Sequence, residues 1–140
     1  MAKRHADLFK SAVLFHRDGA DSRAEGLCRL ILSEDPRNVQ ACHMLGLIAL
    51  KYDKLQGALE FLGKAVHAAP KIAEPRVDYA AALRADGQID QAIVQLRRAI
   101  ELKPGLAIAW GNLGNALAAQ EEPREAETAY RRALDLNPEM

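Results

Sequence analysis

The stretch AWGNLGNALAAQEEPREAETAYRRALDLNP, residues 109–138, decides the fold. Its apolar residues recur at intervals of about three or four, which is the spacing of one face of a helix. The turn signal Glu121-Glu122-Pro123 interrupts this pattern, and Pro138 ends it because proline breaks a continuing helix. The stretch therefore predicts two short helices joined by a turn.

The same pattern is repeated along the chain with a constant period. Proline recurs every 34 residues, at Pro36, Pro70, Pro104 and Pro138. A fixed period of this length is the signature of a repeat architecture, in which each unit packs mainly on its neighbours. After a leader of residues 1–4, the repeat predicts a single domain over residues 5–140, made of the units 5–38, 39–72, 73–106 and 107–140.

Each unit keeps the same register of small and large residues. The eighth and twentieth positions are small and the twenty-fourth is larger, so two helix backbones can approach closely. These positions hold Ala12, Gly46, Ala80 and Gly114; Ala24, Ala58, Ala92 and Ala126; and Cys28, Leu62, Leu96 and Tyr130. We expect no strand and eight helices, at residues 5–18, 22–34, 39–52, 56–68, 73–85, 89–101, 107–119 and 123–135.

This register resembles the tetratricopeptide repeat, a helix–turn–helix unit of about 34 residues. The resemblance covers residues 5–140, and the last unit carries it best, at Trp110, Leu113, Gly114, Leu117, Ala126, Tyr130, Ala133 and Pro138. The chain departs from the family pattern at Cys28, Ile31, Ala49 and Arg76. The resemblance implies an all-α, right-handed α-solenoid (superhelix) whose first helices line a concave face.

Composition and charge exclude several classes of function. Lys plus Arg and Asp plus Glu number 19 each, so no net field favours nucleic acid or an anionic membrane. No apolar run approaches the roughly 20 residues of a membrane span, and Asp7 and Lys10 interrupt the apolar start that a signal peptide needs. We therefore expect a cytoplasmic protein that neither inserts into a membrane nor binds nucleic acid.

No group of residues has the spacing of a catalytic or metal site. The sequence contains neither an HExxH pattern, nor a phosphate-binding loop, nor a serine in a nucleophile elbow. His16 and His43 share the expected concave face, but two histidines without a third ligand make a poor metal site. Cys28 and Cys42 come near each other if adjacent units stack, and two buried thiols are favoured over a disulfide. We expect no enzyme activity, no metal and no cofactor.

The resemblance implies that a partner protein or peptide binds to the first helices. Carried over position by position, the candidate partner-binding residues are Phe9, Val13, His43, Met44, Leu47, Val77, Asp78, Ala81, Arg84, Ile108, Asn112 and Asn115. They match neither the two-carboxylate clamp of the family's chaperone adaptors nor the asparagine ladder of its O-linked N-acetylglucosamine transferases. Asn112 and Asn115 are interpreted as ordinary surface groups, whereas the apolar members form a strip of the kind that marks an interaction site.

We interpret the chain as a non-enzymatic scaffold that binds a peptide or a helical segment in a partly apolar groove. Two alternatives stay open: a substrate-recognition arm of a larger enzyme, such as a transferase, and a self-assembly module. A solenoid's last repeat needs a polar outer face or an added cap. Ala129, Tyr130 and Leu136 are expected on that open face, and they predict a weak homodimer through the last repeat.

Overall fold

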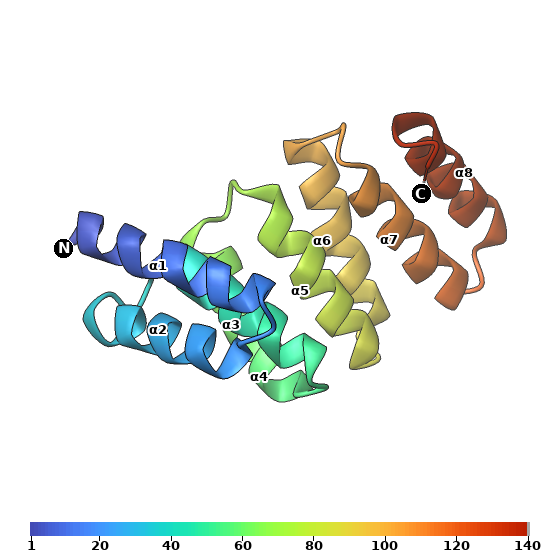
Figure 1. Ribbon diagram of the computed structural model, residues 1–140. Helices are drawn as coiled ribbons and strands as arrows, with labels where there is room; N and C mark the ends of the chain where they lie inside the picture. Colours follow the sequence, from blue (N-terminus) through green and yellow to red (C-terminus); the bar gives the residue numbers. More distant parts are fainter. Residues whose placement is uncertain (140) are drawn as a thin grey trace. The chain divides into compact units, whose positions relative to one another are not determined.

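The computed structural model describes residues 1–139, and this part of the chain is all-α, with no strand (Figure 1). Its helices are α1 (Ala2–Arg17), α2 (Asp21–Glu34), α3 (Val39–Lys51), α4 (Leu55–Ala68), α5 (Ala73–Ala85), α6 (Ile89–Leu102), α7 (Ala107–Ala119) and α8 (Pro123–Leu136). These bounds confirm the helices expected from the sequence to within about one residue, with one exception. Helix α1 begins at Ala2 and so includes most of the leader.

The early start of α1 has its cause at the end of α2. His5 is buried, and its Nε2 lies 3.0 Å from Glu34 Oε1. Arg4 also pairs with Glu34, and this guanidinium is the main cause of the lowered pKa of the Glu34 carboxyl. Because the partners lie far apart in the sequence, helical spacing alone gives no sign of this contact.

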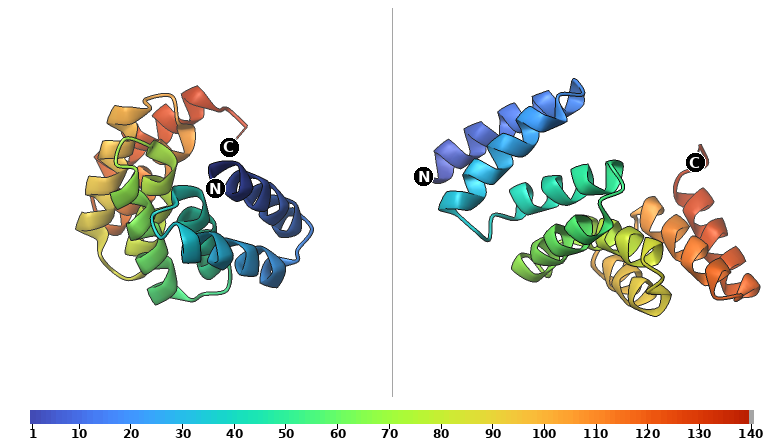
Figure 2. Two further views of the ribbon diagram at one scale, coloured as in Figure 1. Left: turned by 90° about the vertical axis from the view of Figure 1, so that its left-hand side faces the viewer. Right: turned by 90° about the horizontal axis from the view of Figure 1, so that it is seen from below.

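The chain forms two compact units, residues 1–69 and the part that begins at Pro70. In the first unit, α1 packs on α2 and α3 on α4, and α3 also packs on α2. In the second unit, the hairpins α5–α6 and α7–α8 form in the same way, and α7 packs on both α5 and α6. Figure 2 shows the same hairpins from two further sides. Each unit therefore contains two of the repeats, and a single domain over residues 5–140 stays a prediction.

The turn inside every hairpin places one residue in the left-handed region of backbone space. These residues are Gly19 (φ +80°), Asp53 (φ +57°), Gly87 (φ +82°) and Glu121 (φ +61°). The following N–H then closes the end of the first helix, as in the bond from Ala20 N to Phe15 O of 2.7 Å. Glycine adopts this conformation without penalty, whereas Asp53 and Glu121 are strained there.

The small residues of the repeat lie where the two helices of a hairpin come closest. A Cβ atom added to Gly46 would lie 2.4 Å from Leu62 Cγ, and one added to Gly114 would lie 2.6 Å from the Tyr130 ring. The remaining members of the set are buried alanines: Ala12, Ala24, Ala58, Ala80, Ala92 and Ala126. The register of small and large residues is thereby confirmed.

Arg76 departs from the family pattern but makes the same contact as its equivalent one repeat later. Its Nε and Nη2 donate to Pro70 O at 3.1 and 2.8 Å. Trp110 Nε1 donates to Pro104 O at 3.0 Å. Both side chains occupy the fourth position of a unit and donate to the carbonyl of the proline six residues earlier. Two different residue types therefore fix the segment between that proline and the first helix of the unit.

Candidate binding sites

A buried carboxylate joins three helices of the first unit. Asp21 lies in the first turn of α2 and is only 5% exposed. Its Oδ2 accepts hydrogen bonds from Lys51 Nζ and Tyr52 Oη, each at 2.7 Å. Its Oδ1 lies 2.6 Å from Nδ1 of His16, which donates because an ionised carboxylate only accepts. The end of α1, the start of α2 and the end of α3 are thus held at one point.

The charge state of this cluster indicates a structural role. The Lys51 ammonium, followed by the Tyr52 hydroxyl and His16, holds the pKa of Asp21 well below its usual range. The same carboxylate raises the pKa of both Lys51 and Tyr52. A carboxylate that stays ionised and has donors on both oxygens is poorly suited to carry a proton in catalysis. The cluster fixes the helices beside it and presents no acid–base chemistry.

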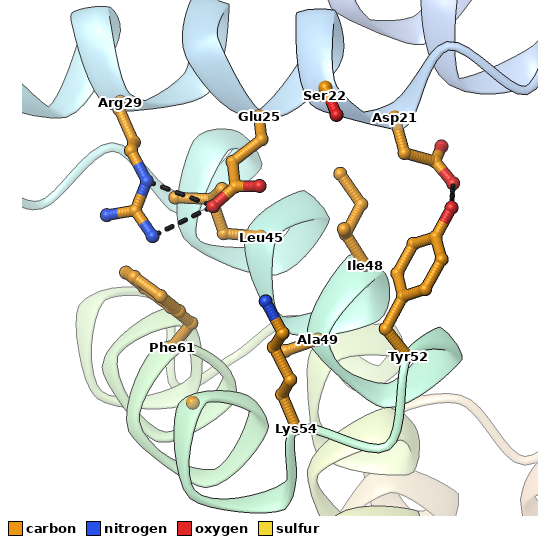
Figure 3. Close-up of a pocket in the computed structure, with 11 residues that line it drawn as sticks. Asp21, Ser22, Glu25, Arg29, Leu45, Ile48, Ala49, Tyr52, Lys54 and Phe61 are labelled. Carbon is orange, nitrogen blue, oxygen red and sulfur yellow. Dashed lines mark hydrogen bonds and ion pairs between the residues drawn. The ribbon is translucent and has the colours of Figure 1, made fainter.

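Next to this cluster lies a depression that we call the α2–α4 furrow, because α2 and α4 form its walls and α3 its floor (Figure 3). It has a volume of about 350 Å³. The floor carries the apolar side chains Leu45, Ile48 and Ala49. The α2 wall holds the ion pair between Glu25 and Arg29, and the α4 wall holds Lys54, Gly57 and Phe61. The furrow therefore combines an apolar floor with a charged rim.

The second unit has a hollow of its own at the α7–α8 hairpin, with a volume of about 370 Å³. We call it the α7–α8 hollow, and its lining residues are Gly111, Asn112, Asn115, Tyr130, Ala133 and Leu134. Tyr130 Oη donates to Asn115 Oδ1 at 2.6 Å, while the Tyr130 ring packs over Gly114. Asn115 is thus more than an ordinary surface asparagine, since it fixes the aromatic ring that forms one wall.

The candidate residues of the first unit are only partly accessible. Phe9 and Val13 are half-buried against the core of this unit, and His43 and Leu47 are also half-buried. Met44 is 7% exposed and belongs to that core, so its place on an open binding strip is wrong. Its long, flexible side chain fills space among the neighbouring apolar residues, as methionine commonly does.

The candidate residues of the second unit divide in the same way. Val77 is 3% exposed, so it offers no open surface either. Asp78, Ala81 and Asn112 are half-buried, whereas Arg84, Ile108 and Asn115 are exposed. Of this set the α7–α8 hollow brings together Asn112 and Asn115. The other members stay predicted contributors, each within its own unit.

The expected open face of α8 needs one correction. Ala129 is 2% exposed, because its small side chain lies on the side of α8 that faces Trp110 and Leu113. Tyr130 keeps an exposed edge and Leu136 is half-buried. Leu134 is 47% exposed and was missed, although it follows Tyr130 by four residues and therefore shares its face. The open apolar pair on α8 is Tyr130 and Leu134.

The two cysteines and the candidate metal ligands of the described residues are placed as follows. Cys28 and Cys42 are buried free thiols, and burial raises the pKa of Cys28 to about 11. Residues 1–139 contain no group of three or more His, Cys, Asp or Glu side chains that could hold a metal ion. Over the same range, every helix is too short or too polar to cross a membrane.

The repeated hairpins place the chain in the class of all-α helical-repeat proteins. A profile of the tetratricopeptide repeat matches residues 107–140, and a TPR repeat profile matches residues 80–121. MamA from Desulfovibrio magneticus RS-1 is similar in fold with a TM-score of 0.84 and 22% identity, over 96% of this chain and 76% of that one. YrrB, a TPR protein with an unusual peptide-binding site, has a TM-score of 0.82 and 24% identity, over 96% and 70%. Residues 80–140 therefore match the tetratricopeptide repeat, as the sequence predicted, and the similar folds confirm the predicted all-α solenoid class; its right hand stays a prediction.

Two curated proteins are also similar in sequence over 86% of the chain. Protein O-mannosyl-transferase TMTC1 of Mus musculus is 32% identical over 125 residues, and BBSome complex member bbs-4 of Caenorhabditis elegans is 24% identical over 120 residues. The chain spans 13% of the length of the first and 26% of the second. It therefore matches only a part of each of these relatives.

Proposed function

We propose that the chain is a non-catalytic interaction module that binds a peptide or helical segment of a partner protein. The observation that carries this proposal is the α7–α8 hollow, where polar amides stand beside an open apolar surface. Leu134 and the edge of Tyr130 supply the apolar part. Exposed apolar surface rimmed by polar groups is typical of binding sites rather than of inert surface.

The chemistry of the hollow suits a polypeptide ligand. The Asn115 carbonyl accepts from Tyr130, so its exposed NH₂ group is oriented to donate to a backbone carbonyl of the ligand. Asn112 is half-buried at the same rim and offers a second amide to the ligand's backbone. Leu134 and the exposed edge of Tyr130 then receive an apolar side chain. In this proposal Ile108 and Arg84 extend the contact within the same unit, and the protein acts in the cytoplasm.

A second candidate function is a substrate-recognition arm of a larger enzyme. It is supported by the 32% identity to a mouse protein whose name is that of an O-mannosyl-transferase. Repeat modules of this kind present a surface, and the reaction belongs to whatever chain they are joined to. The proposal predicts that the isolated chain binds its ligand and leaves it chemically unchanged.

A third candidate is self-assembly through the last hairpin, which the exposed side chains of Tyr130 and Leu134 support. Sedimentation equilibrium over a concentration series tests it. A weak homodimer raises the average mass with concentration, and Leu134→Glu abolishes that rise. An average mass that stays equal to that of one chain at every concentration argues for a monomer. The hollow would then be left to a different partner.

Peptide display on the folded chain tests the first proposal. We expect selected peptides to lose affinity when Leu134→Glu places a charge in the hollow. Val94→Glu is the matched control, because Val94 is also an exposed apolar residue of the same unit but lies outside the hollow. The assignment would be contradicted if the peptides bound Leu134→Glu as tightly as the parent chain. It would also be contradicted if Val94→Glu lowered their affinity as much as Leu134→Glu does.

A further inference from the structure

The two units carry related furrows whose lining residues coincide at five equivalent positions. In the second unit the furrow lies between α6 and α8 over α7, with a volume of about 440 Å³. Two repeats separate the equivalent residues, so Arg97 corresponds to Arg29 and Leu113 to Leu45. The lining residues of the two furrows can therefore be compared position by position.

The first difference concerns the carboxylate that faces the wall arginine. In the second unit, Glu125 on α8 lies across the furrow from Arg97, with 3.4 Å between Oε2 and Nη2. The equivalent of Glu125 in the first unit is Gly57, which has no side chain. Arg29 is held instead by Glu25 of its own helix, at 2.9 and 3.1 Å. Among the described residues the α2–α4 furrow thus has no ion pair between its walls, although the Arg29 guanidinium lies 5.6 Å from the centre of the Phe61 ring on the opposite wall.

Packing does not require a glycine at position 57. A Cβ atom there would lie 3.7 Å from Ala49 Cβ, which is an ordinary contact, whereas a Cβ on Gly46 would clash with Leu62. An interior helical glycine weakens a helix relative to alanine, so this one has a cost without a structural return. Its effect is to leave free space above Ala49, beside the half-buried ring of Phe61.

The second difference concerns the charge at the rim. Lys54 is the N-cap residue of α4, and Figure 3 shows its ammonium reaching into the furrow; the equivalent residue of the second unit is Glu122. Among residues 1–139 its side chain makes no ion pair or hydrogen bond, while Asp21 is neutralised by Lys51 and Glu25 by Arg29. Among the described residues of this rim, Lys54 is therefore the positive charge that remains available to pair with an acidic group of a ligand.

We propose that the α2–α4 furrow is a second binding site, which takes an extended segment of a partner protein. An apolar side chain of the segment fills the space over Ala49 between Gly57 and Phe61. A neighbouring aspartate or glutamate side chain pairs with Lys54. The site lies in the first unit and does not depend on the α7–α8 hollow.

Short peptides titrated into the full chain test this site, with amide shifts read by NMR. The probe is acetyl-Gly-Leu-Glu-Gly-amide, and the matched control replaces its glutamate with lysine. We expect the glutamate peptide to shift the amides of Ala49, Lys54 and Gly57. Its affinity should be about twofold to fivefold higher than that of the lysine peptide at low salt, which is what an exposed ion pair supplies.

Variants of the chain complete the test. Lys54→Glu and Gly57→Glu each install the residue of the second unit, and both should weaken the glutamate peptide, while Lys10→Glu on α1 should not. Equal binding of the two peptides, or unchanged binding by Lys54→Glu, overturns the proposal. A third probe is a leucine peptide that has no acidic side chain but a free terminal carboxylate. If only this peptide binds, the proposal that an acidic side chain of the ligand pairs with Lys54 is overturned. Shifts confined to the α7–α8 hollow overturn the furrow and leave the proposed function standing.

Discussion

A single methyl group added at Gly114 should destabilise the α7–α8 hairpin. In Gly114→Ala the new Cβ would lie 2.6 Å from both Cδ1 and Cε1 of Tyr130 and 2.9 Å from Cζ. These atoms belong to a rigid ring, so the ring must move as a whole. Its hydroxyl is bonded to Asn115, and an outward swing therefore breaks that hydrogen bond.

The magnitude follows from three contributions to the free energy of unfolding. Overpacking costs about 1–3 kcal/mol, and the broken hydrogen bond costs about 1 kcal/mol. The higher helix propensity of alanine offsets about 0.5–1 kcal/mol. Because Tyr130 is 37% exposed and has room to move, the overpacking cost falls in the lower part of its range. We expect a net loss of about 1–2 kcal/mol.

Urea unfolding followed by circular dichroism measures this loss. Gly57→Ala is the matched control, since its Cβ meets only an ordinary contact, and it should gain about 0.5–1 kcal/mol. In a Tyr130→Ala background, Gly114→Ala should also cease to be destabilising, because the clashing ring is gone. If Gly114→Ala were as stabilising as Gly57→Ala in the parent chain, the close approach of α7 and α8 would be refuted.

Four further outcomes are expected. Glu121→Gly should raise stability by about 0.5–1 kcal/mol, because it relieves a left-handed backbone; a lower thermal midpoint would contradict this. The pKa of Asp21 is lowered in the folded state, so its contribution is present above the unfolded pKa of about 3.9 and is lost as the pH falls through the folded pKa. Urea midpoints should therefore fall below about pH 4, and Asp21→Asn should flatten that fall; parallel pH profiles would argue against it. Cys28 and Cys42 should resist Ellman's reagent until denaturant is added, and rapid reaction in buffer would contradict their burial. Asn112→Ala should change stability by less than about 0.5 kcal/mol in the same melts, and a larger loss would give this asparagine a structural role.

The helices and their register were predictable because they depend on local spacing. The proline period and the small residues at Gly46 and Gly114 predicted both the hairpins and their close contacts. Helical spacing could not decide which of two adjacent residues at the edge of a helix face is buried and which is exposed. Ala129 and Tyr130 are adjacent in sequence, and the structure turns the small residue inward and leaves the edge of the ring exposed.

The polar contacts were beyond reach from the sequence, because their partners lie in different helices. The Asp21 cluster joins residues from α1, α2 and α3, and no spacing rule relates them. The one local signal was that Asp21 lies in the first turn of a helix, but exposed aspartates are also common at that position. Met44 shows the opposite error, since its repeat position indicated an open face while its long side chain packs into the core.

The central claim is that the chain binds a polypeptide at the α7–α8 hollow. An NMR titration of the full chain with a display-selected peptide tests it most directly. We expect shifts of the Gly111, Asn115 and Leu134 amides that saturate at one peptide per chain. A saturating peptide that leaves all three amides unchanged would contradict it.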